Sequence, residues 1–280
     1  MLKLGEKQTL IVVKNVEFGV YLAANKEAGE ERVLLPAKQV PKGIKTGDFL
    51  EVFLYKDSKD RFIATTREPK LTLNQFAVLK VAQVTKIGAF LDWGLEKDLF
   101  LPYKEQTARV KQGDEILVRL YIDKSERLCA SMKGLYHILS QNPPYRVEDD
   151  VQGRVYEFSR NFGAFVAVDD KYSALIPKHE DHSQLHIGEV IHARVTEVKE
   201  DGKLTLSLRK KAYLQIEEDA NRVLQVIEEF AGVLPFNDKA PAEVIMRDVG
   251  LSKNAFKRAV GHLYKERIVE ITDKSIRLVK

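Results

Sequence analysis

Two phenylalanines three residues apart, Phe162 and Phe165, flank a glycine and an alanine inside an otherwise apolar stretch. On a regular strand, residues three apart point to opposite faces, but a bulge or bend at Gly163 would bring both rings to one face. Exposed rings side by side form a platform on which nucleic-acid bases stack, at about 1–3 kcal/mol per base. For an isolated pair, burial of Phe162 in the core is the simpler interpretation, because large aromatic side chains are usually buried.

The same spacing recurs, which favours the exposed platform over the core. The chain reads FGVY at 18–21, IGAF at 87–90 and FGAF at 162–165. A constant spacing in three copies of about 60–75 residues indicates an internal repeat. After each copy an apolar stretch ends in a proline, and a glycine follows eleven residues later: Pro36 and Gly47, Pro102 and Gly113, Pro177 and Gly188.

The residues around these rings are typical of strands. Apolar and polar residues alternate with a period of two, so that Ala164, Val166 and Val168 share the face opposite Phe165. The sequence EDGK at 200–203 suits a tight hairpin. Five short strands separated by turns predict a small closed β-barrel for each repeat. A sandwich is the alternative, although a repeat of this length is small for one.

Beyond residue 211 the period changes to that of helices. A second helix is expected between Pro241 and Gly250, and Ser252 is a good N-cap for a third. Two short strands follow at 267–271 and 275–279. Three helices and a hairpin resemble a winged helix, whose third helix often enters a nucleic-acid groove. In the first helix the apolar residues at helical spacing are Ala220, Val223, Leu224, Ile227 and Phe230.

The third of these helices carries a basic face. Lys253, Lys257 and Arg258 are its candidates for contact with nucleic acid. A solvated helix face is the simpler alternative, and winged helices also serve protein contacts. Both alternatives stay open at this point.

The three repeats resemble the S1 RNA-binding domain, an oligonucleotide/oligosaccharide-binding (OB) barrel whose hallmark is a Phe-Gly-Ala-Phe-Val stretch. Residues 151–168 match closely, 81–94 match well, and 12–24 match in register. The resemblance implies a mainly β fold class: three five-stranded OB-fold barrels in tandem, followed by an α+β winged-helix domain. In the S1 family the two aromatic residues contact RNA, which implies contacts by Phe18 and Tyr21, by Ile87 and Phe90, and by Phe162 and Phe165.

Ile87 departs from the aromatic pattern, so the second barrel is expected to stack bases less well. Trp93 could compensate for the missing ring. The alternative for Trp93 is a half-buried position in the core.

The resemblance also implies RNA contact by charges in the last hairpin of each barrel. The family tends to place an arginine there four residues after an aspartate, and Arg61 and Arg127 occupy those places. The third copy has Lys199 and Lys203, which can still meet phosphates but lack the bidentate fork of arginine. A solvated turn is the alternative for these charges.

Along essentially its full length the chain is similar to the CvfB (conserved virulence factor B) family of bacterial RNA-binding regulators. The order of domains and the stretch GLSKNAFKRAVGHLYKERIVEI at 250–271 carry this resemblance. It implies RNA binding and regulation of gene expression after transcription. The expected domains are a first barrel at 1–68, a second barrel with its linker at 69–140, a third barrel at 145–211 and the winged helix at 212–280.

Composition limits the remaining possibilities. The chain is 44% hydrophobic and 31% charged with a net charge of +4, which indicates a soluble globular protein whose mild basic excess permits a polyanionic partner. No apolar run approaches the about 20 residues of a membrane span, and no secretory signal is evident, so neither a membrane partner nor export from the cytoplasm is expected. Cys129 is the single cysteine, which excludes an internal disulfide.

The sequence carries no familiar motif of catalysis. The chain has neither a phosphate-binding glycine loop nor a nucleophile elbow. HEDHSQLH at 179–186 lacks familiar zinc spacing and is expected to be a polar loop. We therefore expect no enzymatic activity, no cofactor, no metal and no small-molecule substrate.

The sequence thus predicts a non-catalytic protein that binds single-stranded RNA across tandem barrels, supported by the winged helix. DNA remains open as a further partner. The alternatives are a winged-helix transcription regulator on duplex DNA, and an adaptor bound to ribosomal or polymerase proteins. An enzyme would need a site outside these motifs.

Overall fold

The computed structural model describes residues 2–26, 31–57, 59–208 and 212–279. The chain divides into two compact units, Met1–Leu208 and Arg209–Lys280. The predicted change from strands to helices after residue 211 adjoins residues 209–211, which lie outside the described residues. The residue boundaries assigned to the single domains stay a prediction.

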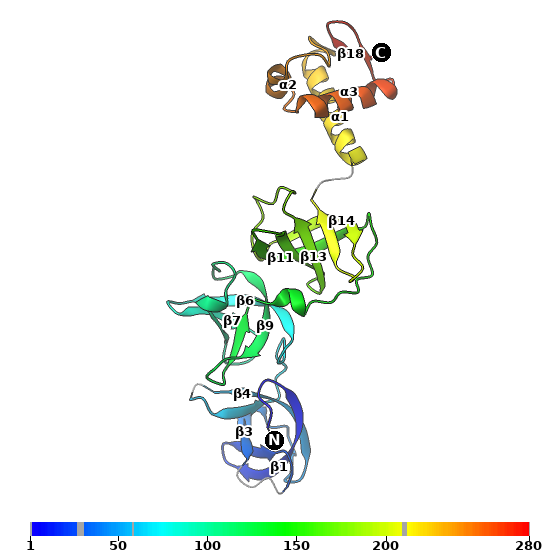
Figure 1. Cartoon of the computed structure of the whole chain (residues 1–280). Helices are drawn as coiled ribbons and strands as arrows, with labels where there is room; N and C mark the ends of the chain where they lie inside the picture. The colour runs from blue at the N-terminus through cyan, green and yellow to red at the C-terminus, as the bar shows by residue number, and fades with distance from the viewer. Residues whose placement is uncertain (1, 27–30, 58, 209–211, 280) are drawn as a thin grey trace. The chain divides into compact units, whose positions relative to one another are not determined.

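The first unit contains three closed five-stranded barrels with one common strand order, which confirms the predicted fold class (Figure 1). The first barrel runs in the order β1-β2-β3-β5-β4, and the second and third repeat that order with their own strands. The strands of the first barrel are β1 Lys7–Val16, β2 Gly19–Ala23, β3 Arg32–Pro36, β4 Phe49–Lys56 and β5 Phe62–Thr65. Those of the second are β6 Phe76–Val84, β7 Gly88–Asp92, β8 Leu99–Pro102, β9 Glu115–Ile122 and β10 Leu128–Ser131. Those of the third are β11 Asp150–Ser159, β12 Gly163–Val168, β13 Tyr172–Pro177, β14 Val190–Val198 and β15 Leu204–Ser207.

The described part of this unit also contains three short 3-10 helices. η1 Ala37–Gln39 and η2 Tyr103–Glu105 each follow the proline that ends the third strand of their barrel. η3 Leu135–His137 lies in the connection between the second and third barrels. Its neighbour Ser140 donates and accepts backbone hydrogen bonds with Lys171 and Ser173, so this connection is tied to the third barrel.

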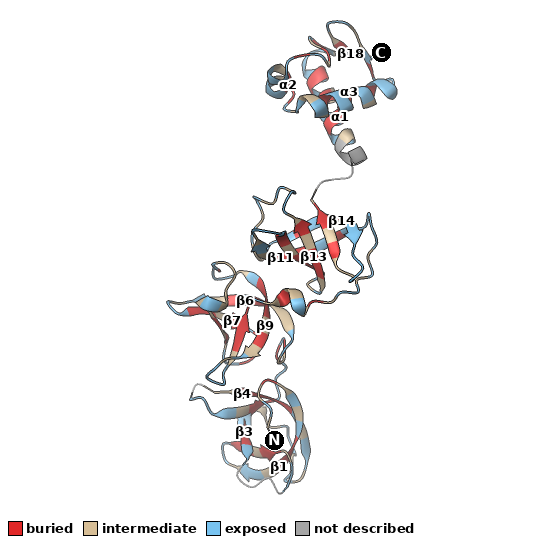
Figure 2. Ribbon diagram, viewed as in Figure 1, coloured by how far each residue is buried: buried red, intermediate tan, exposed pale blue. Residues whose placement is uncertain are grey.

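Alternation along the strands separates core from surface in each barrel (Figure 2). In the third barrel Ala164, Val166 and Val168 point inward and are fully buried, as the period of two predicts. Phe165 lies on the outer face and is half-buried. Ala167 shares that outer face yet is buried, because it packs with Leu135 and other residues of the inter-barrel connection.

The backbone bends at Gly163, the residue at which a bend was expected to bring both aromatic rings to one face. Gly163 begins β12 with a φ of +123°, so Phe162 precedes the strand and is freed from its alternation. A Cβ atom at Gly163 would stand 2.1 Å from the carbonyl oxygen of Ile176 on the neighbouring strand. Only glycine permits both this backbone angle and this approach.

The second unit is a winged helix. Its helices are α1 Ala212–Glu229, α2 Ala242–Asp248 and α3 Lys253–Lys265, and the N-cap Ser252 accepts a hydrogen bond from the backbone of Ala255, as expected. The three-stranded sheet has the order β16-β18-β17, with β16 Val233–Leu234, β17 Val269–Ile271 and β18 Ile276–Leu278. One buried cluster that includes Val223, Ile245 and Phe256 joins the three helices.

Two details of this unit differ from the sequence-based expectation. Phe230 is 42% exposed instead of facing inward, because the helix ends at Glu229 and Ala231 and Gly232 take positive φ values that turn the chain into β16. β16 itself has only two residues, too few for a period to reveal it.

Candidate nucleic-acid interface

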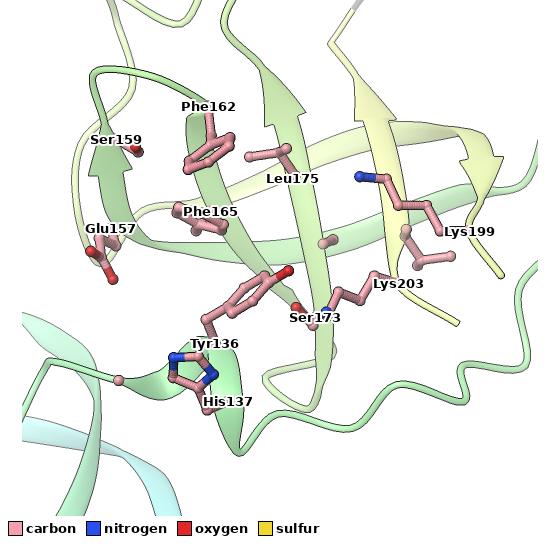
Figure 3. A pocket seen from close by; sticks show the side chains of 13 residues that line it. Tyr136, His137, Glu157, Ser159, Phe162, Phe165, Ser173, Leu175, Lys199 and Lys203 are labelled. Atoms are coloured by element: carbon pink, nitrogen blue, oxygen red, sulfur yellow. The ribbon is translucent and has the colours of Figure 1, made fainter. Parts of the chain in front are cut away.

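The third barrel carries a cleft of about 450 Å³ on its outer face (Figure 3). Phe162 is 61% exposed at its rim, and Phe165 is half-buried inside it. The two ring centroids are 6.4 Å apart and the ring planes make an angle of 60°. Both rings therefore share one face, as the bend at Gly163 was expected to achieve. We call this site the third-barrel cleft; its main side chains are Tyr136, Glu157, Phe162, Phe165, Lys199 and Lys203.

The Phe165 ring is held between two tyrosines. Tyr156, which is fully buried, lies 6.1 Å away, centroid to centroid, at an interplanar angle of 30°. Tyr136 meets Phe165 edge-on, with 5.3 Å between the centroids. Burial raises the pKa of the Tyr156 hydroxyl, so this residue stays neutral and serves as a support.

Tyr136 is a lining residue that sequence reasoning missed. It belongs to η3 in the connection before the third barrel, outside the repeat. Leu135 and Leu139 on either side of it are buried against Tyr156 and Ala167, and this packing holds the tyrosine against the third barrel. In the sequence Tyr136 is only an aromatic residue between two leucines, and such a pattern does not by itself indicate a binding site.

Two lysines form the opposite wall of the third-barrel cleft. The Lys203 ammonium lies 4.4 Å from the Tyr136 ring centroid and pairs with Asp201 at 2.7 Å. The hydrogen bond that Lys203 donates to Asp201 raises the pKa of the lysine, so this side chain is a cation at neutral pH. Among the residues that the structure describes, the Lys199 ammonium makes no direct ion pair, although it interacts at longer range with Asp201.

The first barrel repeats the aromatic pair. Phe18 is 59% exposed, and its ring centroid lies 6.4 Å from that of the half-buried Tyr21 in an edge-on arrangement. The Arg32 guanidinium lies 5.2 Å from the Tyr21 ring centroid. Arg61 is paired with Asp57 at 2.7 Å, so its guanidinium is fixed on the hairpin, with part of its donors already used.

The second barrel has an isoleucine where the other two barrels have the first phenylalanine of the pair. Ile87 is 65% exposed, and Phe90 packs against Phe100 with 5.3 Å between ring centroids. Trp93 does not replace the missing ring, because it is buried. Its ring centroid lies 5.7 Å from that of Phe53 of the first barrel, and its indole N–H donates a hydrogen bond to the carbonyl of Lys97. The alternative of a core position for Trp93 is therefore correct, with deeper burial than expected.

Arg127 forms its ion pair with a different residue from Asp123, the aspartate four residues before it. Its guanidinium pairs with Asp60 in the hairpin of the first barrel, whereas Asp123 accepts hydrogen bonds from the backbone N–H groups of Arg127 and Ser125. Spacing within one hairpin could not reveal a partner in another barrel. Arg127 still lines a cleft beside Phe90 and Ile87, so it remains a candidate for contact with a ligand of the second barrel.

The candidate cations of the winged helix lie on α3. Lys257 and Arg258 are exposed, whereas Lys253 is partly covered and donates to the carbonyl of Lys239 at 3.4 Å. Tyr264, seven residues after Lys257 and thus on the same side of the helix, is 56% exposed. Lys257 and Tyr264 thus lie on one side of α3, and the exposed Arg258 lies next to them round the helix, away from the buried residues Phe256, Ala259, Val260 and Leu263.

Comparison with known proteins identifies the family to which this chain belongs. An S1-domain model matches residues 4–67 and 75–133, the model of the second domain of the virulence regulatory factor CvfB matches 137–210, and the model of a CvfB-like winged helix domain matches 221–278. The uncharacterized protein YitL of Bacillus subtilis is 30% identical over 272 residues, which cover 93% of this chain and 89% of YitL. The chain belongs to the CvfB family.

Other relatives agree with this assignment. The conserved virulence factor B of Staphylococcus saprophyticus is 29% identical over 248 residues, covering 85% of this CvfB-family chain and 82% of the relative. A crystal structure of a multidomain protein with nucleic acid binding domains from Streptococcus pneumoniae superposes with a TM-score of 0.56, at 24% identity, over 99% of this chain and 98% of the other. At that identity the superposition supports the fold alone.

The domains of this CvfB-family chain are of nucleic-acid-binding types, S1 and winged helix, and neither type is catalytic. Within the described residues no group of histidine, cysteine, aspartate and glutamate side chains is arranged to hold a metal ion. In the loop at 179–186, His182 stacks on Phe158 with an angle of 17° between the rings. None of the described helices is long and apolar enough to cross a membrane.

Proposed function

We propose that this protein binds single-stranded RNA across its barrels and acts in the cytoplasm as a non-catalytic, post-transcriptional regulator of gene expression. The third-barrel cleft is the main contact, and α3 of the winged helix supports it. The single observation that carries the proposal is the exposed ring of Phe162 beside Phe165, with two ammonium groups across the same cleft.

The rings suit unpaired bases better than a duplex. Sequence-tolerant recognition of single strands relies on aromatic side chains against which bases stack, combined with cations along the backbone. Leaving a phenylalanine ring largely in water forgoes about 1.5–3 kcal/mol of burial, which base stacking would recover. Phe162 and Phe165 with Lys199 and Lys203 supply both components within one cleft.

Apart from Glu157, which lines the cleft, and Asp201, which pairs with Lys203, the acidic residues of the third barrel oppose this assignment mainly at long range. Residues 147–211 hold 10 basic and 12 acidic residues, whereas 1–70 hold 13 and 10. Charges separated by more than about 8–10 Å in physiological salt are largely screened. The lysines that line the cleft therefore weigh more at contact distance than acids elsewhere on the barrel.

A double substitution, Phe162→Ala with Phe165→Ala, tests the proposal. Loss of two stacking rings should weaken binding of a short single-stranded RNA by about 10-fold to 100-fold, measured by fluorescence anisotropy on the full chain. Phe49→Ala is the matched control, because Phe49 is an equally exposed ring outside the paired positions. Unchanged affinity, or loss of the folded circular-dichroism spectrum, would contradict the proposal.

The second candidate function is regulation of transcription through duplex DNA. The exposed pair Lys257 and Arg258 on α3 favours it, because this helix is the one that enters the groove in many winged helices. Single-stranded RNA and duplex DNA of equal length, titrated at one salt concentration, separate the two functions. Tighter binding of the duplex, with no effect of the phenylalanine substitutions, would favour the DNA function; weak binding of both would favour a protein adaptor.

A further inference from the structure

The third-barrel cleft contains an acid that RNA binding by itself does not explain. Glu157 lies on β11, where its Cα is paired with that of Phe165, and Phe165 is paired in turn with Leu175 on β13. Residues paired across neighbouring strands share one face of the sheet. Glu157 therefore stands in the same outer row as the rings, within the cleft itself.

This carboxylate is half-buried, and none of the described residues forms a direct hydrogen bond or ion pair with it. Burial raises the pKa of its carboxyl group above the ordinary value, while the Lys133 ammonium acts in the opposite direction. A carboxylate that is partly withdrawn from water without a donor is unfavourable, so a ligand that brings N–H donors to it gains affinity.

The charges of the cleft are arranged to orient a nucleotide. Figure 3 shows Glu157 on one side of Phe165 and the two lysines on the other. Strands β12 and β13 lie between β11, which carries Glu157, and β15, which directly follows Lys203. Phosphate oxygens are attracted to Lys199 and Lys203 and repelled by Glu157. A nucleotide between the rings is therefore expected to turn its phosphate toward the lysines and the edge of its base toward Glu157.

The edges of the four bases differ in what they offer to a carboxylate. Guanine presents two adjacent N–H donors on its Watson–Crick edge, N1–H and the N2 amino group. Uracil presents one N–H between two carbonyls, and adenine and cytosine present an amino group next to an unprotonated ring nitrogen, so each of the three places an acceptor beside the carboxylate. Two parallel N–H···O bonds to a charged acceptor are the strongest arrangement.

From this geometry we infer that the third-barrel cleft selects guanine, with Glu157 as the specificity-determining residue that accepts hydrogen bonds from N1–H and N2–H. The inference rests on the proposed function, since it concerns which base of a bound RNA enters the cleft. Tyr136, Phe162 and Phe165 supply the sequence-tolerant stacking. Glu157 supplies the discrimination, which for one good bidentate pair amounts to about tenfold or more.

Short oligouridine strands with one central guanosine, inosine, adenosine or cytidine test the inference on the full chain. The guanosine strand is expected to bind about tenfold more tightly than the adenosine and cytidine strands. Inosine keeps N1–H but lacks the N2 amino group, so its strand should bind with intermediate affinity. Equal binding of all four strands would overturn the inference while leaving RNA binding intact.

Glu157→Gln is the decisive variant. It keeps the size of the side chain but replaces one acceptor oxygen by a donor, so the guanosine preference should fall below about threefold. Glu200→Gln removes one negative charge from the exposed hairpin of the same barrel and should leave the preference unchanged. A preference that survives Glu157→Gln would overturn the inference, whereas failure of every strand to bind would overturn the proposed function with it.

Discussion

At the scale of single residues, Gly163 determines where Phe162 lies. Its φ of +123° and the 2.1 Å that would separate a Cβ from the Ile176 carbonyl oxygen exclude any side chain. A Cβ atom at the corresponding Gly19 or Gly88 would likewise stand 2.1 or 2.4 Å from the carbonyl oxygen of Leu35 or Leu101. The repeated glycine thus preserves the bend in all three barrels, and the bend is what keeps the first residue of each pair out of the core.

We therefore expect Gly163→Ala to open the edge of the third barrel. The substitution combines an unfavourable backbone angle, worth about 1–3 kcal/mol, with a clash against backbone atoms that cannot move aside. Amide hydrogen exchange should accelerate in β12 and β13, since the opening is local. Exchange followed by mass spectrometry is the suitable measurement, because Trp93 is the single tryptophan and lies in the second barrel.

Gly113→Ala is the matched control for this prediction. Gly113 also has a positive φ, +94°, but a Cβ there would meet no atom within 4 Å. Gly113→Ala should therefore incur only the cost of the unfavourable backbone angle, about 1–2 kcal/mol, and should accelerate amide hydrogen exchange less than Gly163→Ala. Equal effects of the two substitutions would show that close approach contributes nothing at Gly163.

At the scale of elements, α3 is the test of whether the winged helix takes part in binding. Lys257→Glu with Arg258→Glu should weaken RNA binding and flatten its salt dependence, by about 0.7 in the slope of log K against log[salt] for each phosphate that α3 no longer neutralises. The measurement is a binding titration at several salt concentrations. Lys42→Glu with Lys45→Glu imposes the same change of net charge in an exposed loop of the first barrel. An unchanged slope in the α3 variant would remove this helix from the interface.

The sequence predicts elements well where they repeat or follow a long period. The constant spacing from aromatic pair to proline to glycine was sufficient for three barrels, and helical spacing with the Ser252 cap was sufficient for α3. Elements defined by tertiary contact escaped prediction. β16 forms only by pairing with β18, and Tyr136 joins the cleft only because its neighbours pack on the third barrel.

The same distinction holds for charged side chains. Spacing identified the hairpin arginines, and in the first barrel Arg61 does pair with the aspartate four residues before it. Arg127 follows the same spacing yet pairs with Asp60, because another barrel offers it a carboxylate. Glu157 was absent from the candidates because an acid in an RNA-binding repeat has meaning only once its neighbours in space, Phe165 above all, are known.

At the scale of the whole molecule, the chain carries similar surfaces of unequal quality. The third barrel has two rings, a supporting tyrosine and two lysines; the first has two rings; the second has one ring and an exposed isoleucine. Sites in series on one chain raise overall affinity through effective concentration when a single ligand can reach more than one of them. A weak first-barrel site should therefore matter for long RNA and not for short RNA.

This dependence on length is the last prediction. An RNA of about 8 nucleotides fills one barrel, and one of about 30 can reach several, since an OB fold covers about 4–16 nucleotides. The longer strand should bind at least about tenfold more tightly.

Phe18→Ala with Tyr21→Ala should remove most of that gain while leaving affinity for the short strand within about twofold, because the third-barrel cleft is untouched. Anisotropy titrations of both strands against both proteins make the comparison. A gain that persists in the variant would mean that the first-barrel rings do not contact RNA. A strong weakening of the short strand as well as the long one would mean that the first barrel, not the third, is the principal site.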